Sequence, residues 1–268
     1  MTVEERASYQ AAADRFDGFA DLYDEVRPVP PRELGDVLSR YSRPSRLVVD
    51  LGSGTGLSTR WVATWASHVV GVEPNDTMRS RAEAIGGERI DYRPGWSHET
   101  GLPDGCADVV VIVQALHWMD PTPTFAEIAR VLRPGGVFAA IDCDWPPTVA
   151  DALAERAWVT CRRNIKEFES RLTGGVAKWS KSTHLERMIA SGEFEWCREI
   201  ALTSIEHGNA ERFISLLKSQ GDYQALGRHG VDDSTLGVDQ FARLINSRLG
   251  ARTRRWYFTY RVRLAFKA

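Results

Sequence analysis

An apolar run that ends in an acidic residue and a glycine-rich turn occupies residues 48–56, with the sequence V-V-D-L-G-S-G-T-G. A helix-compatible stretch follows from Leu57 to Ala66, and a second apolar run ends at Glu73. A strand, a tight turn, a helix and a second strand make a βαβ unit, whose glycines let the backbone pass close to a ligand. A carboxylate at the tip of the second strand can accept hydrogen bonds from both hydroxyls of a ribose. The pattern therefore predicts a parallel α/β sheet that binds a nucleoside-containing cofactor.

The spacing of the glycines decides between classes of nucleoside cofactor. Dinucleotide enzymes use G-x-G-x-x-G, whose third glycine falls at Leu57 here, whereas this chain has its third glycine at Gly56. Asp50 stands just before the turn, where a carboxylate repels a pyrophosphate and can hold an ammonium group. S-adenosylmethionine offers a ribose for Glu73, an ammonium for Asp50 and no phosphate. A nicotinamide dehydrogenase is the rival enzyme class, and an ordinary strand-to-helix turn is the alternative without a ligand.

Composition sets broader limits. The chain has 268 residues, of which 43% are hydrophobic, enough for one large α/β domain with a sizeable core. Its 34 basic and 36 acidic residues give a net charge of -2, so we expect a small-molecule substrate and neither a nucleic-acid nor a membrane partner. The 4 cysteines lie far apart without metal-ligand spacing, which predicts no metal site. Residues 1–20 hold no apolar core of signal-peptide length, which predicts a cytoplasmic location.

Strand and helix signals alternate along the first half of the chain. We expect helices at 57–66, 75–85 and 121–132, with Asn75 as an N-cap, and later strands at 89–92, 107–113 and 137–141. This alternation is typical of a doubly wound parallel sheet. The nearly continuous apolar run at 107–113 predicts a strand that is buried on both faces. Residues 133–136, R-P-G-G, are expected to separate the third of these helices from the fifth strand.

The second half has a different pattern. Helical signals at 148–172 and 181–189, with a glycine hinge at 173–175 between them, predict a lid. Residues 256–266 alternate between large apolar side chains and Thr259, Arg261 and Arg263, which predicts a strand with one solvated face. Such a strand suits an antiparallel position near a sheet edge, paired with residues 199–205.

Several motifs together carry a family resemblance. They are F-D-G-F-A-D-L-Y-D-E-V-R-P at 16–28, the glycine turn, V-E-P-N-D-T-M at 72–78, V-Q-A-L-H-W-M at 113–119 and V-L-R-P-G-G at 131–136. Residues from about 16 to 142 resemble the class I S-adenosylmethionine-dependent methyltransferases of type 11, and within them the trans-aconitate-methyltransferase-like group. The resemblance implies a Rossmann-like α/β fold with a mostly parallel seven-stranded sheet, an antiparallel C-terminal strand and a helical lid. It implies one domain over 1–268, with a cap at 1–45, a cofactor-binding core at 46–146, the lid at 147–195 and completing strands and helices at 196–268.

The resemblance also implies a site for S-adenosylmethionine. Its residues are Tyr23, Arg27, Asp50, Gly52, Ser53, Gly54, Gly56, Glu73, Pro74, Met78, Trp96, Ser97, Gln114 and His117. The glycines would let the backbone approach the methionine portion, and Met78 would pack against the adenine. Arg27 would pair with the carboxylate of the cofactor or of a substrate. The chain departs from its relatives at Trp96, because they commonly carry a small polar residue followed by a carboxylate near the adenine edge.

Methyl transfer is an in-line displacement at a sulfonium, so the protein mainly aligns the acceptor and excludes water. If the acceptor is a hydroxyl or an amine, His117 is the expected general base, and if it is a carboxylate no base is required. The alternative for His117 is a histidine that only holds its loop. Four aromatic residues are expected to bind an apolar or planar substrate, although each also suits a core position: Trp118, Trp145, Trp179 and Tyr223.

The predicted function is thus methylation of a small molecule, at a carboxylate or hydroxyl oxygen. One alternative is a methyltransferase of protein or nucleic acid, with Arg252, Arg254 and Arg255 as a basic patch. The other is a methyltransferase-like module without catalysis, which only Trp96 favours. The sequence leaves the acceptor and the oligomeric state open.

Overall fold

The computed structural model describes residues 20–42, 46–173 and 178–268. Residues 1–19 of the expected cap, which include the start of the N-terminal motif at Phe16, lie outside the described residues, as do Gly174 and Gly175 of the expected hinge. The chain divides into two compact units. We call the described residues within 29–143, 178–202 and 260–268 the sheet unit, and those within 20–28, 144–173 and 203–259 the helical unit.

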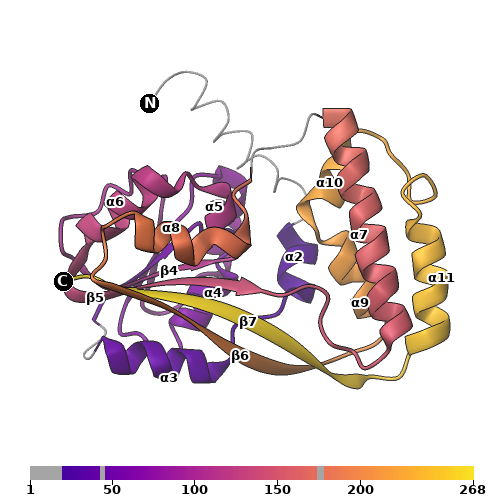
Figure 1. Cartoon of the computed structure of the whole chain (residues 1–268), viewed down its shortest axis with the longest axis horizontal. Helices are drawn as coiled ribbons and strands as arrows, with labels where there is room; N and C mark the ends of the chain where they lie inside the picture. The colour runs from indigo at the N-terminus through magenta and orange to yellow at the C-terminus, as the bar shows by residue number, and fades with distance from the viewer. Residues whose placement is uncertain (1–19, 43–45, 174–177) are drawn as a thin grey trace. The chain divides into compact units, whose positions relative to one another are not determined.

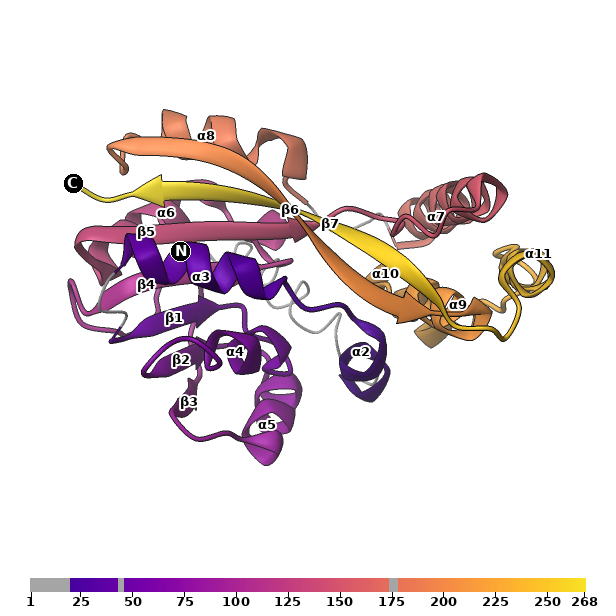
Figure 2. The same ribbon diagram turned by 90° about the horizontal axis from the view of Figure 1, so that it is seen from below.

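Seven strands form one mixed sheet in the order β3-β2-β1-β4-β5-β7-β6 (Figure 2). The strands are β1 (Val48–Leu51), β2 (Val69–Val72), β3 (Ile90–Arg93), β4 (Ala107–Val113), β5 (Leu132–Cys143), β6 (Trp196–Gly208) and β7 (Arg254–Phe266). Strands β1 to β5 pair in parallel, whereas β7 runs antiparallel to β5. The predicted mostly parallel sheet with an antiparallel C-terminal strand is confirmed. Strands β6 and β7 each contribute residues to both units.

Two of the helices of the sheet unit, α5 (Asp76–Ile85) and α6 (Pro121–Val131), begin at a side-chain N-cap. The others are α3 (Arg32–Tyr41), α4 (Leu57–Val62) and α8 (His184–Ala190), with the short 3₁₀ segments η2 (Leu116–Trp118) and η3 (Lys181–Thr183). The predicted N-cap is confirmed, since Asn75 Oδ1 accepts from the backbone of Met78 at 2.8 Å. Asp120 caps α6 in the same way, with a proline at the first helical position. Figure 1 shows α6 and α8 on one side of the strands and α3 on the other.

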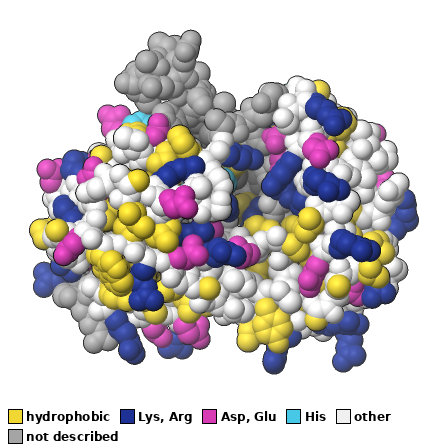
Figure 3. Space-filling model, viewed as in Figure 1, with side chains coloured by type: hydrophobic (Ala, Val, Ile, Leu, Met, Phe, Trp, Pro, Cys, Tyr) yellow, Lys and Arg dark blue, Asp and Glu magenta, His cyan; other side chains and the backbone are white. Residues whose placement is uncertain are grey.

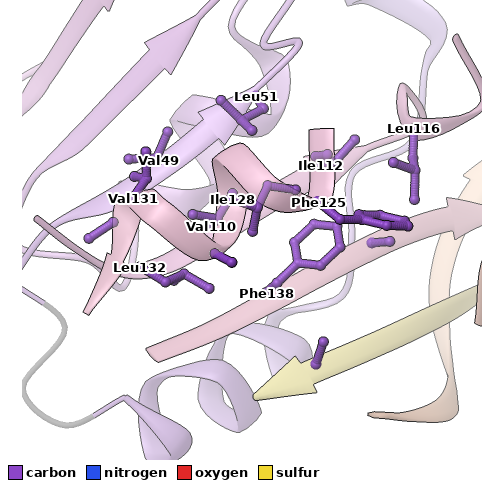
Figure 4. Packing of buried hydrophobic residues seen from close by; sticks show 14 of the residues in the cluster. Val49, Leu51, Val110, Ile112, Leu116, Phe125, Ile128, Val131, Leu132 and Phe138 are labelled. Atoms are coloured by element: carbon purple, nitrogen blue, oxygen red, sulfur yellow. The ribbon is translucent and has the colours of Figure 1, made fainter. Parts of the chain in front are cut away.

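The core of the sheet unit lies between the strands and α6. Every residue of β4 from Ala107 to Ile112 is buried, which confirms a strand covered on both faces. Phe125 and Ile128 of α6 point towards Phe138 of β5 (Figure 4). Burial of one such side chain stabilises the fold by roughly 1.5–3 kcal/mol. This packing fixes the carboxyl ends of the strands, where ligands of parallel sheets bind.

Two details of the predicted strands are wrong. Residues 133–136 do not separate helix from strand, because β5 already begins at Leu132, which pairs with Ala107 ahead of a bulge. The strand at 256–266 does not keep one solvated face, because Arg263 and Ala265 are buried. The reason is that other side chains cover this face, where Arg263 pairs with Asp142 of β5 and Glu199 of β6.

The helical unit consists of α2 (Ala20–Val26), α7 (Ala152–Thr173), α9 (Ala210–Lys218), α10 (Gly221–Arg228), α11 (Val238–Leu249) and the adjoining parts of β6 and β7. Helices α7, α9, α10 and α11 lie together in Figure 1. Trp158 and Phe213 are fully buried there, with ring centroids 5.0 Å apart. None of the described helices combines the length and apolarity that crossing a membrane requires. Side chains of both charge signs are spread over the face shown in Figure 3, and Arg252, Arg254 and Arg255 are all exposed.

Candidate active site

The glycine turn joins β1 to α4 at the carboxyl edge of the sheet. Gly52, Gly54 and Gly56 have φ angles of 71°, 56° and 81°, which side chains other than glycine rarely adopt. The backbone N–H of Gly52 donates to the carbonyl of Val72 at 2.8 Å, so the turn is fixed to the end of β2. A Cβ atom at Gly54 would meet only Met78 Cε, at 3.6 Å. The turn is therefore rigid, and the backbone at Gly54 is open to close approach.

Gly56 has a second reason to lack a side chain, besides its positive φ, and the motif alone does not reveal it. A Cβ atom there would lie 2.1 Å from the hydroxyl oxygen of Tyr92, and one at Gly71 would lie 2.6 Å from the same ring. Tyr92 on β3 thus packs between the third glycine of the turn and β2. Burial raises the pKa of its hydroxyl. The signal in the sequence was the glycine inside the second strand, because a strand glycine often marks close approach of another group.

Gly56→Ala is expected to lower the free energy of unfolding by about 3 kcal/mol, since the new methyl group adds a clash with Tyr92 to backbone strain. Gly101→Ala is the matched control, because Gly101 also has a positive φ, +66°, but a Cβ atom there would meet nothing within 4 Å. The control should lose only about 1 kcal/mol. Urea unfolding of both variants measures the difference, and equal losses would show that Tyr92 does not constrain the turn.

Glu73 follows β2 and is 7% exposed. Its Oε2 accepts from the backbone N–H of Gly54 and its Oε1 accepts from that of Asn75, both at 2.9 Å. Burial raises the pKa of Glu73 to about 7, against the effect of these two hydrogen bonds. Each carboxylate oxygen has a second lone pair, so both can still accept a hydrogen bond. The residue is held in place beside the turn with acceptor capacity to spare.

Asp50 is fully buried at the end of β1. Its Oδ2 accepts from the hydroxyls of Ser58 and Thr59 in the first turn of α4, each at 2.7 Å. Its Oδ1 has no hydrogen-bond partner among the described residues. Burial raises the pKa of Asp50 to about 6. The carboxylate therefore braces the turn through one oxygen and keeps the other for a further donor.

The residues expected at the adenine end lie around the next strand tips. Met78 is buried on α5 beneath the turn, and Pro74 is half-buried between Glu73 and the helix cap. Trp96 is half-buried and pairs through its backbone with Glu99, and its ring lies 6.3 Å from that of His98. The Ser97 hydroxyl lies 2.8 Å from that of Thr124 in α6. The buried Ser53 hydroxyl, in the turn itself, has no partner among the described residues.

The turn after β4 carries Gln114, His117 and Trp118. Gln114 has φ +58° and donates its backbone N–H to Ile141 at 2.8 Å. The carbonyl of His117 accepts from the backbone N–H of Trp179 at 2.9 Å, which brings one predicted substrate residue onto this turn. The imidazole of His117 lies 4.9 Å from the ring of Trp118. The Trp179 side chain is 41% exposed, with the guanidinium of Arg187 4.7 Å from its ring centre.

Beside this turn is a buried charge network that no sequence motif indicates. Asp142 at the end of β5 lies 2.8 Å from both the Lys181 ammonium and the Arg263 guanidinium. Arg263 also pairs with Glu199 of β6 at 2.6 Å. Burial lowers the pKa of His184 to about 4, so this neighbouring imidazole stays neutral at pH 7. The sequence gives no signal for these contacts, because the alternation along the strand predicts a solvated face for Arg263.

Four predicted site residues belong to the helical unit. Arg27 donates to the hydroxyl and the carbonyl of Ser219 at 3.0 and 2.8 Å, and its guanidinium lies 4.8 Å from the Tyr23 ring and 5.0 Å from the Trp145 ring. Cation–π contacts of this kind fix the guanidinium in orientation. The Tyr223 hydroxyl donates to Asp233 at 2.6 Å. The structure thus brings Tyr23, Arg27 and Trp145 together, while the other predicted site residues except Tyr223 gather in the sheet unit.

The residues that form this edge of the sheet are similar in sequence to known methyltransferases. Residues 49–140 match the family described as a methyltransferase domain. An uncharacterized methyltransferase of Mycobacterium tuberculosis is 36% identical over 121 residues, which are 45% of this chain and 49% of that protein. The ubiquinone biosynthesis O-methyltransferase of Hahella chejuensis is 25% identical over 201 residues, which are 73% of this chain and 74% of that protein.

Solved structures extend the likeness to the fold of the chain. A structure from Anaeromyxobacter dehalogenans, described as that of a type II methyltransferase, superposes with a TM-score of 0.64 at 24% identity and covers 90% of this chain and 97% of that one. The chain spans about half of the length of the curated relatives from Mycobacterium and Dictyostelium discoideum. Residues 49–140 thus match a methyltransferase domain in sequence, and the chain is similar in fold to a solved structure that is described as a methyltransferase.

Proposed function

We propose that the chain is an enzyme that transfers the methyl group of S-adenosylmethionine to an oxygen atom of a small molecule. The observation that carries the proposal is Glu73, a buried carboxylate at the tip of β2 that is hydrogen-bonded to the glycine turn. Each of its oxygens uses one lone pair on the backbone and keeps one, which matches the two hydroxyls of a ribose. The vacant oxygen of Asp50 on the other side of the turn suits an ammonium group.

The bound cofactor supplies a methyl group on a sulfonium, and the chain's own residues position the acceptor. The turn after β4 holds His117 at the carboxyl edge of the sheet, fixed through its carbonyl to Trp179. For a hydroxyl acceptor we assign His117 as the group that removes the proton. For a carboxylate acceptor, as the trans-aconitate-methyltransferase-like resemblance suggests, His117 only shapes the turn. The name of the Hahella chejuensis relative, an O-methyltransferase, supports an oxygen acceptor.

Binding of S-adenosylhomocysteine to the purified protein tests the proposal. A ligand at about 100 times its dissociation constant adds roughly 2.7 kcal/mol of stability, so melting should shift upwards by several degrees. NAD at the same concentration should leave the melting temperature unchanged. A shift with NAD alone would replace the proposed enzyme class by the dehydrogenase. No shift with either compound would favour the module without catalysis.

Cofactor affinity should depend on pH through Glu73. Ribose hydroxyls donate to the ionised carboxylate, so binding favours the deprotonated form of a group whose pKa is about 7 in the unliganded protein. Binding then releases a proton below pH 7, and Glu73 alone should make the dissociation constant for S-adenosylhomocysteine about tenfold higher at pH 6 than at pH 8, to which Asp50, with a pKa of about 6, adds about twofold. Calorimetry at both pH values, in two buffers of different ionisation enthalpy, counts the proton. A dissociation constant that is equal at both pH values contradicts this role of Glu73.

A further inference from the structure

Gln114 occupies an unusual position at the end of β4. Its φ of +58° is uncommon for a residue other than glycine, and such strain costs on the order of 1–3 kcal/mol. Strain of this size persists only where surrounding contacts hold the residue, and it often marks a functional turn. The backbone N–H bond to Ile141 supports one side of the residue.

Lys181 holds the side chain of Gln114 in place. Its ammonium donates to Gln114 Oε1 at 2.7 Å and lies 2.8 Å from Asp142 Oδ1. Asp142 is 3% exposed and is itself held by Arg263 at 2.8 Å, so the position of the ammonium is fixed from β5 and β7. Nothing in the family comparison or in the sequence motifs assigns a role to Lys181.

The contact with Lys181 decides which way the amide of Gln114 faces. An ammonium only donates, so Oε1 faces Lys181 and the two N–H donors of Nε2 face away from it. Nε2 is buried and has no acceptor among the residues that the structure describes. A buried donor without an acceptor costs about 1–3 kcal/mol, which a ligand oxygen in that place would recover.

Two further contacts show that the segment 178–181 braces the turn 114–118. The backbone of Trp179 donates to His117, and the Lys178 ammonium lies 4.5 Å from the centre of the Trp118 ring. The brace thus meets the turn at three points and brings two lysines to it. The charge of Lys181 is paired with Asp142, but the Lys178 ammonium beside a pair of N–H donors favours an anionic oxygen over a neutral one.

We propose that Lys181 is a positioning residue, which orients the Gln114 amide towards a carboxylate of a bound ligand. The inference rests on the proposed function, because it takes the turn after β4 to be part of the methyl-transfer site. The carboxylate has two possible sources with the same chemistry: the methionine part of the cofactor, or the acceptor molecule.

Calorimetry with S-adenosylhomocysteine and with 5′-methylthioadenosine, which lacks the amino-acid part, separates the sources. If the carboxylate is the cofactor's, Lys181→Met and Gln114→Leu should each weaken S-adenosylhomocysteine at least ~10-fold and leave 5′-methylthioadenosine unchanged. Lys181→Arg keeps a donor and a charge, so it should stay within ~3-fold of the wild type. Lys166→Met, on the exposed face of α7, removes a lysine elsewhere and serves as the control.

If the carboxylate belongs to the acceptor, both nucleosides bind all variants equally. Succinate titrated into the S-adenosylhomocysteine complex should then bind the wild type and Lys181→Arg but neither Lys181→Met nor Gln114→Leu. The inference is overturned if Lys181→Met affects neither titration, or if it weakens both nucleosides equally without rescue by arginine. A wild type that binds S-adenosylhomocysteine while Lys181→Met matches it in both titrations overturns this inference alone. A wild type that does not bind S-adenosylhomocysteine overturns the proposed function as well.

Discussion

Glu73→Gln is expected to weaken the binding of S-adenosylhomocysteine about 100-fold, because it replaces one carboxylate acceptor by an amide donor and removes the charge. The wild-type carboxylate already accepts from Gly54 and Asn75, so its geometry is set before the ligand arrives. Gln has the same shape and keeps the surrounding packing. The loss therefore reports the hydrogen bonds to the ribose, and calorimetry at pH 8 measures it.

Without ligand, Glu73→Gln should not lose stability, although it loses affinity for S-adenosylhomocysteine. Burial raises the pKa of Glu73 from 4.5 to about 7, so the fold favours the protonated form. The protonated Glu73 carboxyl contributes roughly 3 kcal/mol to the free energy of unfolding. This contribution is present below pH 4.5 and is lost as the pH rises through 7. Glutamine avoids that loss but leaves one of two backbone N–H donors without an acceptor, which costs about 1–2 kcal/mol. We expect the free energy of unfolding at pH 8 to exceed that of the wild type by about 1–2 kcal/mol.

Asp91→Asn is the matched control for Glu73→Gln. Asp91 lies on the adjacent strand β3, and its side chain is 71% exposed beside His68. The substitution removes the same charge from the neighbouring strand, near its amino end and away from the glycine turn, so it should change the affinity less than ~2-fold. If Glu73→Gln also binds S-adenosylhomocysteine within ~3-fold of the wild type, the ribose does not rest on this carboxylate.

The parts of the fold that could be predicted were those with local signals. The glycine turn, the Asn75 cap and the apolar run of β4 each depend on side chains that act on their own backbone, so their positions follow from neighbouring letters. The strand order at the centre of the sheet follows in turn, because βαβ units have few allowed arrangements. The place of Glu73 beside the turn is a consequence of that order.

The missed features are contacts between segments that are distant in sequence. Tyr92 explains Gly56, and Lys181 explains Gln114, but neither partner stands within a motif. Alternation along a strand reflects only the polarity of that strand, so it predicts a solvated face for Arg263. A buried charge needs a buried partner, and the partner Asp142 is supplied by the neighbouring strand β5. No local pattern contains this information.

Arg263→Met is expected to lower the free energy of unfolding by about 3–5 kcal/mol, because it leaves a buried carboxylate with one cation in place of two. Arg263 is 2% exposed and Asp142 is 3% exposed, so water does not replace the lost guanidinium. Arg261→Met is the control on the same strand. Its side chain is 52% exposed and 3.8 Å from Glu199, so the substitution should cost about 0–1 kcal/mol.

A double variant at Asp142 and Arg263 separates the effect of an unpaired buried charge on stability from the effect of lost packing. Asp142→Leu alone leaves Arg263 buried with one carboxylate partner among the described residues, Glu199, which is 33% exposed. With Arg263→Met in the same chain, neither buried charge remains, and the side chains of Lys181 and Glu199 can reach water. The double variant should therefore lose at least ~2 kcal/mol less than the sum of the two single losses. Additive losses in urea unfolding, or a loss for Arg263→Met no larger than that for Arg261→Met, would show that burial of this network does not depend on its pairing.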